Sequence, residues 1–212
     1  MATVPVIVLP GSGCTPTREC NFYAWFGDFI ASTGRYEPRV RDMPDPHVCR
    51  ERVWMPFVEE ELGASPACVV VGHSSGAVAA LRLAERRRLR GIVVIAGYDS
   101  DLGDANERAS GYFDRPFQWD VIRANCGFVA CVGGARDSVV DIDIQRRVAL
   151  ECLGLEPGKT GAEWLELPNR DHFFTPPFPE LVDLLDRNVA FTDEKRDDAE
   201  DPGDEDEAVT RR

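Results

Sequence analysis

Hydrophobic residues gather in short runs that recur along the chain. Four of the runs are continuous, without polar alternation: residues 6–10, 67–72, 91–97 and 128–134. A strand covered by helices on both faces has this pattern, because neither side of it meets water. Weaker runs at residues 36–41 and 164–167 bring the predicted strands to six.

Segments with helical periodicity separate these strands. They cover residues 19–33, 47–62, 75–88, 117–125, 142–153 and 179–188. Strands that alternate with helices predict an α/β fold, in which a parallel sheet of six strands lies between two helical layers. Two longer connections remain. Residues 98–115 directly follow a strand, as lids and binding loops do, and residues 154–161 are interpreted as a surface turn with no evident chemistry.

The composition indicates one folded domain and a tail. The chain has 212 residues, 43% of them hydrophobic, which is enough for a substantial core. Residues 191–212 differ, because ten acidic and four basic residues leave little apolar surface there. We therefore predict a domain over residues 1–190 and an acidic disordered tail over residues 191–212. We interpret the tail as a solvated segment, with an acidic interaction segment as the alternative.

Charge and cysteine content restrict the partners and the compartment. Acidic residues outnumber basic ones 37 to 24, and a formal charge of −13 disfavours nucleic acid and anionic membranes as partners. The sequence shows neither a secretory signal nor a membrane-spanning segment. Seven cysteines are an odd number without metal-knuckle or redox spacing, so we expect free thiols, no metal site and a cytoplasmic location.

One motif carries chemistry. Gly72-His73-Ser74-Ser75-Gly76 matches G-x-S-x-G and lies between a predicted strand and a predicted helix. A sharp strand-to-helix turn holds the central serine in a strained conformation, and glycines on either side avoid clashes with neighbouring backbone. Ser74 is therefore the predicted nucleophile, near a helix N-terminus that favours negative charge. The alternative is a tight turn whose serines only cap the helix.

A serine hydroxyl needs a base to remove its proton. The chain has three histidines. His73 lies inside the turn, where its side chain should diverge from that of Ser74, and His47 lies before the strand of the nucleophile. His172 follows the last predicted strand, the position expected for the base, so we predict that His172 is the base. Activity should then rise with pH as this ring loses its proton.

The third member of a triad orients the imidazole and stabilises its cation. Asp137 follows the strand at residues 128–134 and fits this role. Asp141 and Asp143 are better placed to begin the next helix. Asp171 is adjacent to His172 in sequence, which makes the required geometry awkward. Asp137 is therefore the predicted acid.

Two backbone amides must also face the oxyanion in acyl transfer. One is predicted to be that of Ser75, and the other that of Ser12 in the glycine loop after the first strand, with Gly11 next. The same loop could cradle a phosphate, but it lacks the lysine and the serine or threonine of a P-loop. Cys14 beside it is interpreted as a small buried apolar residue, and a reactive thiol is the alternative.

Longer segments are similar to the retinoblastoma-binding protein 9-like serine hydrolases of the α/β-hydrolase superfamily. These segments are LPGSG, MPDP, RERVWMPFVEEEL, GHSSGAVAALRLAE, YDSDLGDANERASGYFDRPFQWDVIRANC and the pair His172-Phe173. The resemblance implies a compact hydrolase fold, a six-stranded parallel sheet of order 2-1-3-4-5-6 and a small lid. It also places the triad on Ser74, Asp137 and His172.

The chain departs from this family at three places. The stretch Leu62-Gly63-Ala64-Ser65-Pro66 has neither the cysteine nor the acid of an L-x-C-x-E segment, so retinoblastoma-protein binding is not expected. Arg136 and Ser138 around Asp137 differ from the family pattern. The turn at residues 154–161 looks longer, and the acidic tail is additional.

The predicted function is that of a serine hydrolase acting on an ester or amide of a small molecule or short peptide, without a cofactor. The resemblance suggests small esters and aromatic amino-acid amides as substrates. Together with Gly11, aromatic residues near the lid and the histidine loop are the candidate substrate contacts: Phe113, Phe117, Trp119, Phe173 and Phe174. They are equally interpretable as core residues. The alternatives are a binding protein on a hydrolase scaffold, and an acyltransferase or lyase that uses the same site.

Overall fold

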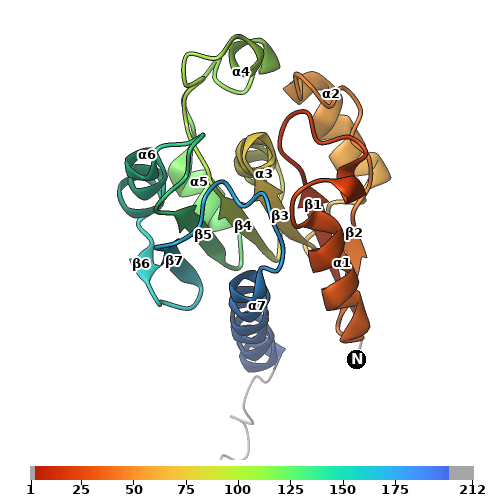
Figure 1. Ribbon diagram of the computed structural model, residues 1–212. Coiled ribbons are helices and arrows are strands. Elements are labelled where there is room, and N and C mark those ends of the chain that lie inside the picture. The colour runs from red at the N-terminus through yellow and green to blue at the C-terminus, as the bar shows by residue number, and fades with distance from the viewer. Residues whose placement is uncertain (1–2, 201–212) are drawn as a thin grey trace, which may run out of the picture.

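The computed structural model describes residues 3–200, which form one parallel sheet with helices on both faces (Figure 1). The strands are β1 (Val4–Leu9), β2 (Tyr36–Arg39), β3 (Val69–His73), β4 (Gly91–Ile95), β5 (Val129–Gly134), β6 (Glu156–Pro157) and β7 (Ala162–Leu167). The α-helices are α1 (Tyr23–Ser32), α2 (Glu51–Pro56), α3 (Ser75–Arg86), α4 (Ala105–Ser110), α5 (Trp119–Asn125), α6 (Ile142–Arg146) and α7 (Pro179–Glu200). A 3₁₀ turn, η1 (Thr17–Glu19), precedes α1, and the π-helical turns η2 (Phe57–Glu61) and η3 (Arg147–Cys152) continue α2 and α6.

The strand order is β2-β1-β3-β4-β5-β7-β6, and every neighbouring pair is parallel. The first six strands in this order match the expected order, so the predicted fold class is confirmed. The number of strands was wrong by one. Residues 154–161, predicted to be a surface turn, contain β6, whose two exposed residues pair with Glu163 and Trp164. A two-residue polar edge strand has no hydrophobic pattern by which a sequence could reveal it.

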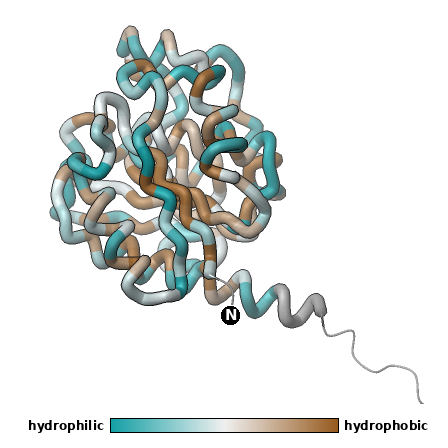
Figure 2. The backbone as a smooth tube through the Cα atoms, turned by 90° about the vertical axis from the view of Figure 1, so that its right-hand side faces the viewer, coloured by the Kyte–Doolittle hydropathy of each residue, from teal (hydrophilic) through white to brown (hydrophobic). Residues whose placement is uncertain are grey.

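Alternate residues of each central strand pack against different helical layers. Val69 and Val71 belong to a hydrophobic cluster with residues of α1 and α7, whereas Val70 packs with residues of α2, α3 and α5. The central strands are hydrophobic along their length (Figure 2). Burial on both faces explains the continuous apolar runs, and it confirms the predicted three-layer architecture.

The long connection after β4 is less irregular than the sequence suggested. It contains α4, whose N-terminus is capped by Asp104: the carboxylate accepts hydrogen bonds from the amides of Asn106 and Glu107, at 2.8 and 3.0 Å. The helix ends at Gly111 in the left-handed conformation. We refer to residues 98–115 as the lid segment. Its six-residue helix is too short for a periodic apolar pattern, and only the cap could have indicated it.

The last helix, α7, extends well beyond its predicted end at residue 188. Arg90, which is nearly buried, donates a hydrogen bond to Thr192 Oγ1 at 2.9 Å and pairs with Asp193. A buried guanidinium needs such partners, and these contacts hold the acidic segment against the sheet. Residues 191–200, predicted to be part of a disordered tail, thus continue α7. The remainder of the predicted tail, residues 201–212, lies outside the described residues.

No helix within residues 3–200 is both long enough and apolar enough to cross a bilayer. All seven cysteines are free.

Candidate active site

Ser74 forms the turn between β3 and α3 by itself. Its backbone has φ +56° and ψ −122°, a conformation that costs a non-glycine residue roughly 1–3 kcal/mol. The turn is held because the amide of Ser74 donates a hydrogen bond to the carbonyl of Ile95 on the neighbouring strand, at 2.9 Å. Ser74 lies at the carboxyl end of β3, with the N-terminus of a twelve-residue helix directly behind it.

The two glycines of the motif have the steric role that the sequence predicts. A Cβ atom on Gly76 would lie 2.1 Å from the carbonyl oxygen of Leu9, and one on Gly72 would lie 2.2 Å from the carbonyl oxygen of Gly76. No side chain fits at these separations, so α3 packs directly on the end of β1 and beside the turn. Gly11 lets the loop after β1 approach Ser74 closely, because a Cβ atom on Gly11 would lie 3.3 Å from the Cβ atom of Ser74.

Asp137 and His172 meet at the same edge of the sheet, in the loops that follow β5 and β7. The two carboxylate oxygens of Asp137 lie 3.0 and 2.9 Å from Nδ1 of His172, and both side chains are almost fully buried. A carboxylate accepts hydrogen bonds, so Nδ1 carries the proton and Nε2 is the free base of the neutral ring. Within residues 3–200 the hydroxyl of Ser74 makes no hydrogen bond. A catalytic contact to Nε2 would form on substrate binding, as unliganded sites often require.

Three further donors fix the Asp137 carboxylate. The amides of Val139 and Val140 donate to Oδ1 at 2.9 and 2.8 Å, and the Gln145 side chain on α6 donates to Oδ2 at 3.0 Å. Burial alone would raise the pKa of Asp137, but the hydrogen bonds from His172 and these amides outweigh it, and the pKa lies below its ordinary value. The carboxylate therefore stays charged and oriented. Gln145 has no motif around it, and sequence reasoning missed it.

The amides near Ser74 differ in whether they are already used. The Gly11 amide donates to the hydroxyl of Tyr23 at 2.8 Å, so it is not free for an oxyanion. Within residues 3–200 the Ser12 amide has no hydrogen-bond partner. The Ser75 amide, the first of α3, has no acceptor inside its helix. Of the two loop candidates that the sequence left open, Ser12 is the one with an available donor.

Comparison with known proteins gives the family. No family model matches, but the chain is 35% identical to the serine hydrolase RBBP9 of Rattus norvegicus over 179 residues, which cover 84% of this chain and 92% of the relative. The chain belongs to the RBBP9 family of serine hydrolases. It is therefore a hydrolase, as the motif and the resemblance predicted.

Solved structures agree on the fold of this RBBP9-family hydrolase. The ydeN gene product of B. subtilis superposes with a TM-score of 0.75 at 18% identity, over 89% of this chain and all of the other. A carboxylesterase of the thaumarchaeon Nitrososphaera gargenis superposes with a TM-score of 0.59 at 15% identity, over 91% and 92% of the two chains. At these identities the likeness establishes an α/β-hydrolase fold.

The rival acids of this RBBP9-family chain have other partners, and the rival histidine His47 lies away from them. Asp171 Oδ1 accepts hydrogen bonds from the amide and hydroxyl of Ser138 and from the amide of His172, at 2.7–2.8 Å, and so joins the two loops. Asp141 caps α6, and Asp143 pairs with Arg146 on the same helix. His47 is exposed in the loop after β2. None of these carboxylates bonds to the His172 ring.

The hydroxyl of Ser75 connects the nucleophile turn to the lid segment. It donates to Glu107 Oε1 on α4 at 2.6 Å and accepts from the hydroxyl of Tyr98 at 3.2 Å. Burial raises the pKa of Glu107. No sequence pattern indicates this contact, because Glu107 lies 32 residues further along the chain.

The aromatic candidates lie in three different environments: three line a cavity, Phe173 is buried, and Phe174 is exposed. Phe113 stacks on Tyr98. Phe117 stacks on Trp119, and the guanidinium of Arg82 lies over its ring. The predicted residues Phe113, Phe117 and Trp119 line a cavity of about 420 Å³ next to the lid segment. Phe173, predicted to contact substrate, is instead buried in the core.

The conformation of the loop that carries His172 explains why Phe173 is buried. Phe173 is only 2% exposed and stacks on Phe178, whereas Phe174 is 46% exposed and its ring centre lies 5.3 Å from that of His172. A φ of +54° at Phe173 turns the backbone and sends successive side chains to opposite sides. Phe174 is therefore better placed than Phe173 to contact a substrate.

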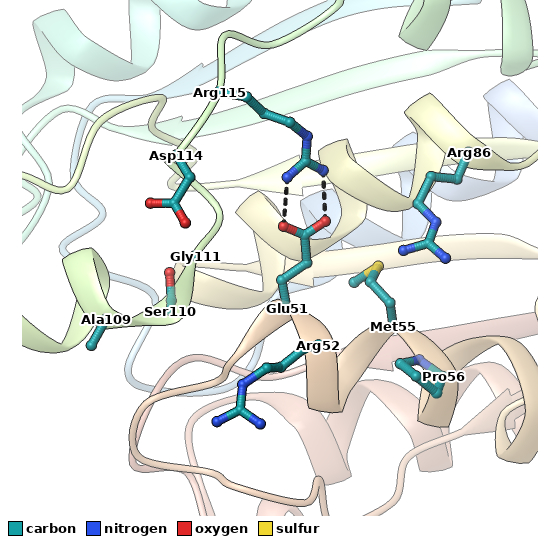
Figure 3. A pocket seen from close by; sticks show the side chains of 10 residues that line it. All are labelled: Glu51, Arg52, Met55, Pro56, Arg86, Ala109, Ser110, Gly111, Asp114 and Arg115. Carbon is teal, nitrogen blue, oxygen red and sulfur yellow. Dashed lines mark hydrogen bonds and ion pairs between the residues drawn. The ribbon is translucent and has the colours of Figure 1, made fainter.

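Another cavity, of about 490 Å³, lies between α2 and the lid segment (Figure 3). Arg115 spans it with two bonds to Glu51, at 2.6 and 2.8 Å, and so ties the end of the lid segment to α2. Ser74, Asp137 and His172 are not among its lining residues. We therefore do not assign it to the predicted reaction.

Cys14, beside the glycine loop, is half-buried, and its sulfur lies 3.8 Å from the Tyr23 hydroxyl. Burial raises the pKa of the thiol to about 11, so it is protonated near neutral pH. This favours the interpretation as a packing residue over a reactive thiol. Within residues 3–200 there is no group of three histidine, cysteine or acidic side chains that could hold a metal ion.

His73 gives the fold a specific sensitivity to acid. Burial, and then the neighbouring His172, lower the pKa of His73 to about 3, whereas a histidine in the unfolded chain titrates near 6.5. Below pH 6.5 the His73 ring therefore binds a proton in the unfolded state but stays neutral in the folded state. The free energy of unfolding should fall with falling pH, by up to about 1.4 kcal/mol per pH unit from this group, between pH 6 and 4.

Urea denaturation from pH 7 to 4 measures the slope of the free energy of unfolding against pH, with a His73→Gln variant as the comparison. Glu107 titrates in the opposite direction, since its raised pKa favours the folded state as it takes up a proton, but it is present in both proteins. The slope should be smaller in the variant. Equal slopes would mean that His73 is not held neutral in the folded protein.

Proposed function

We propose that this hydrolase cleaves an ester or amide bond of a small molecule or short peptide through an acyl-enzyme on Ser74. The observation that carries the proposal is a strained serine at the carboxyl end of β3, at the sheet edge where a buried Asp137–His172 pair is already formed. A serine alone would be a poor nucleophile, and the pair alone would have nothing to activate.

In the proposed reaction, Ser74 Oγ attacks the substrate carbonyl while Nε2 of His172 takes its proton. Asp137 keeps the proton of the neutral ring on Nδ1 and stabilises the imidazolium that forms. The amides of Ser12 and Ser75 donate to the oxyanion of the tetrahedral intermediate. His172 then gives its proton to the leaving group. Water, activated by the same ring, attacks the acyl-enzyme and releases Ser74.

Exposed apolar side chains on the loops around the pair favour an apolar acyl group. Phe174 lies next to His172, Val139 lies two residues after Asp137, and Leu102 belongs to the lid segment. An aromatic or branched acyl group suits these surroundings better than a charged one. Seven free cysteines also favour a reducing compartment, and we propose a cytoplasmic location.

Pre-steady-state hydrolysis of a p-nitrophenyl ester tests the proposal. The first turnover should release p-nitrophenolate in an amount equal to the enzyme, followed by a slower steady state limited by deacylation. Intact mass after acid quenching should show one added acyl group. Hydrolysis without a covalent adduct, under conditions where a burst is seen, would contradict an acyl-enzyme.

A further inference from the structure

A continuous line of hydrogen bonds joins the glycine loop to the loop of the proposed base. The Gly11 amide donates to the hydroxyl of Tyr23 at 2.8 Å, and that hydroxyl lies 2.7 Å from Nδ1 of His73. Nε2 of His73 lies 3.1 Å from the backbone carbonyl of His172. Two loops far apart in sequence are thus connected through one tyrosine and the histidine of the nucleophile turn.

The chemistry of the groups fixes every proton in this line. A carbonyl oxygen can only accept, so Nε2 of His73 must carry the ring proton. The buried ring is neutral, which leaves Nδ1 as an acceptor, and the Tyr23 hydroxyl donates to it. The tyrosine oxygen in turn accepts from the Gly11 amide and from the Asn21 side chain at 3.1 Å. From the Gly11 amide to the His172 carbonyl each group donates to the next, so the line has one direction.

The surroundings exclude water from the line. Tyr23 is fully buried and His73 is 1% exposed, and both pack against the ring of Phe22. Phe173 covers His73 from the side of the base loop. Because no water can replace a lost partner there, removing one group leaves its neighbours unpaired.

We propose that Tyr23 and His73 are positioning residues, which hold the Ser12 amide and the His172 ring on either side of Ser74; this rests on the function proposed above. Tyr23 occupies the Gly11 amide and so leaves Ser12 as the loop donor to the oxyanion. His73 anchors the backbone of the residue whose side chain is the base. Neither side chain contacts substrate, and their effect is on geometry that both steps of the reaction share.

The Tyr23→Phe variant tests this inference. It frees the Gly11 amide and leaves Nδ1 of His73 without a donor. The glycine loop and the loop of His172 are then no longer connected by hydrogen bonds. Displacements of this kind cost up to roughly 100-fold in rate. We expect kcat for a p-nitrophenyl ester to fall roughly tenfold or more, while KM stays within about twofold, since the apolar acyl contacts are untouched.

Labelling by a fluorophosphonate separates mispositioning from misfolding. A mispositioned site should label to completion but roughly tenfold more slowly, whereas a partly unfolded sample should label incompletely. Tyr36→Phe is the matched control, because it removes the hydroxyl of another buried tyrosine, which bonds to Asp186 at 2.5 Å between β2 and α7. This control should keep the wild-type labelling rate.

Three outcomes are distinguishable. A Tyr23→Phe variant that labels and turns over at the wild-type rate overturns the inference and leaves the proposed function standing. A wild-type protein that does not label overturns the proposed function itself. If Tyr23→Phe does not fold, nitrogen-15 spectra of the wild-type histidines decide: the inference requires a neutral His73 with its proton on Nε2 from pH 5 to 8, and a proton on Nδ1 would overturn it.

Discussion

Replacing Ser74 with alanine should lower kcat by roughly 10⁴-fold or more, because the variant has no atom that can form the acyl-enzyme. The residual rate would come from the oxyanion amides and from binding alone. Initial rates with a p-nitrophenyl ester, over a wide range of enzyme concentration, measure the loss. Alanine removes one hydroxyl from a turn held by backbone contacts, so the variant should fold.

Ser32→Ala is the control for this substitution. Ser32 is exposed at the end of α1, and its hydroxyl donates to the backbone carbonyl of Phe29. Its activity should equal that of the wild type. If a folded Ser74→Ala protein kept more than a tenth of the wild-type kcat, the nucleophile would have to be another residue.

Replacing Asp137 with asparagine should lower kcat by about 10⁴-fold, the loss that the same change causes in another Ser-His-Asp enzyme. The asparagine amide can donate to Nδ1 of His172, which shifts the ring proton to Nε2 and leaves no base facing Ser74. The loss should shrink at high pH if hydroxide replaces the base. Steady-state kinetics from pH 6 to 10 measure both effects.

The neighbouring carboxylate supplies the matched control. Asp171→Asn keeps an acceptor oxygen for Ser138 and the His172 amide and does not touch the ring. It should cost less than roughly tenfold in kcat, since it acts only through loop geometry. If Asp171→Asn were as damaging as Asp137→Asn, the assignment of the acid would be wrong.

The parts of the fold that the sequence predicted are those with strong local patterns. The central strands are buried on both faces, so their apolar runs were unambiguous. The two-residue edge strand β6 and the six-residue helix α4 are too short to carry a period. The extension of α7 was missed because acidic composition suggests disorder, whereas the buried Arg90, directly before the distant strand β4, supplies its partner.

The candidate site likewise contains residues that a local sequence pattern predicts and residues that it does not. Ser74 was predictable from a five-residue motif in its strand–helix context, and Asp137 and His172 from their places after strands. Phe173 and Phe174 are adjacent in sequence, and only the backbone turn at Phe173 decides which of them is buried. Tyr23 and His73 are 50 residues apart, and a contact of that range leaves no pattern in a single sequence.

Fluorophosphonate labelling of the wild-type protein, followed by mass spectrometry of its peptides, tests the central claim most directly. The reagent reacts with activated serines, so the account predicts a single adduct, on Ser74 and not on the adjacent Ser75. Labelling should be lost on heat denaturation and in Asp137→Asn. A folded protein that remains unlabelled, or one that carries the adduct on another residue, would contradict the account.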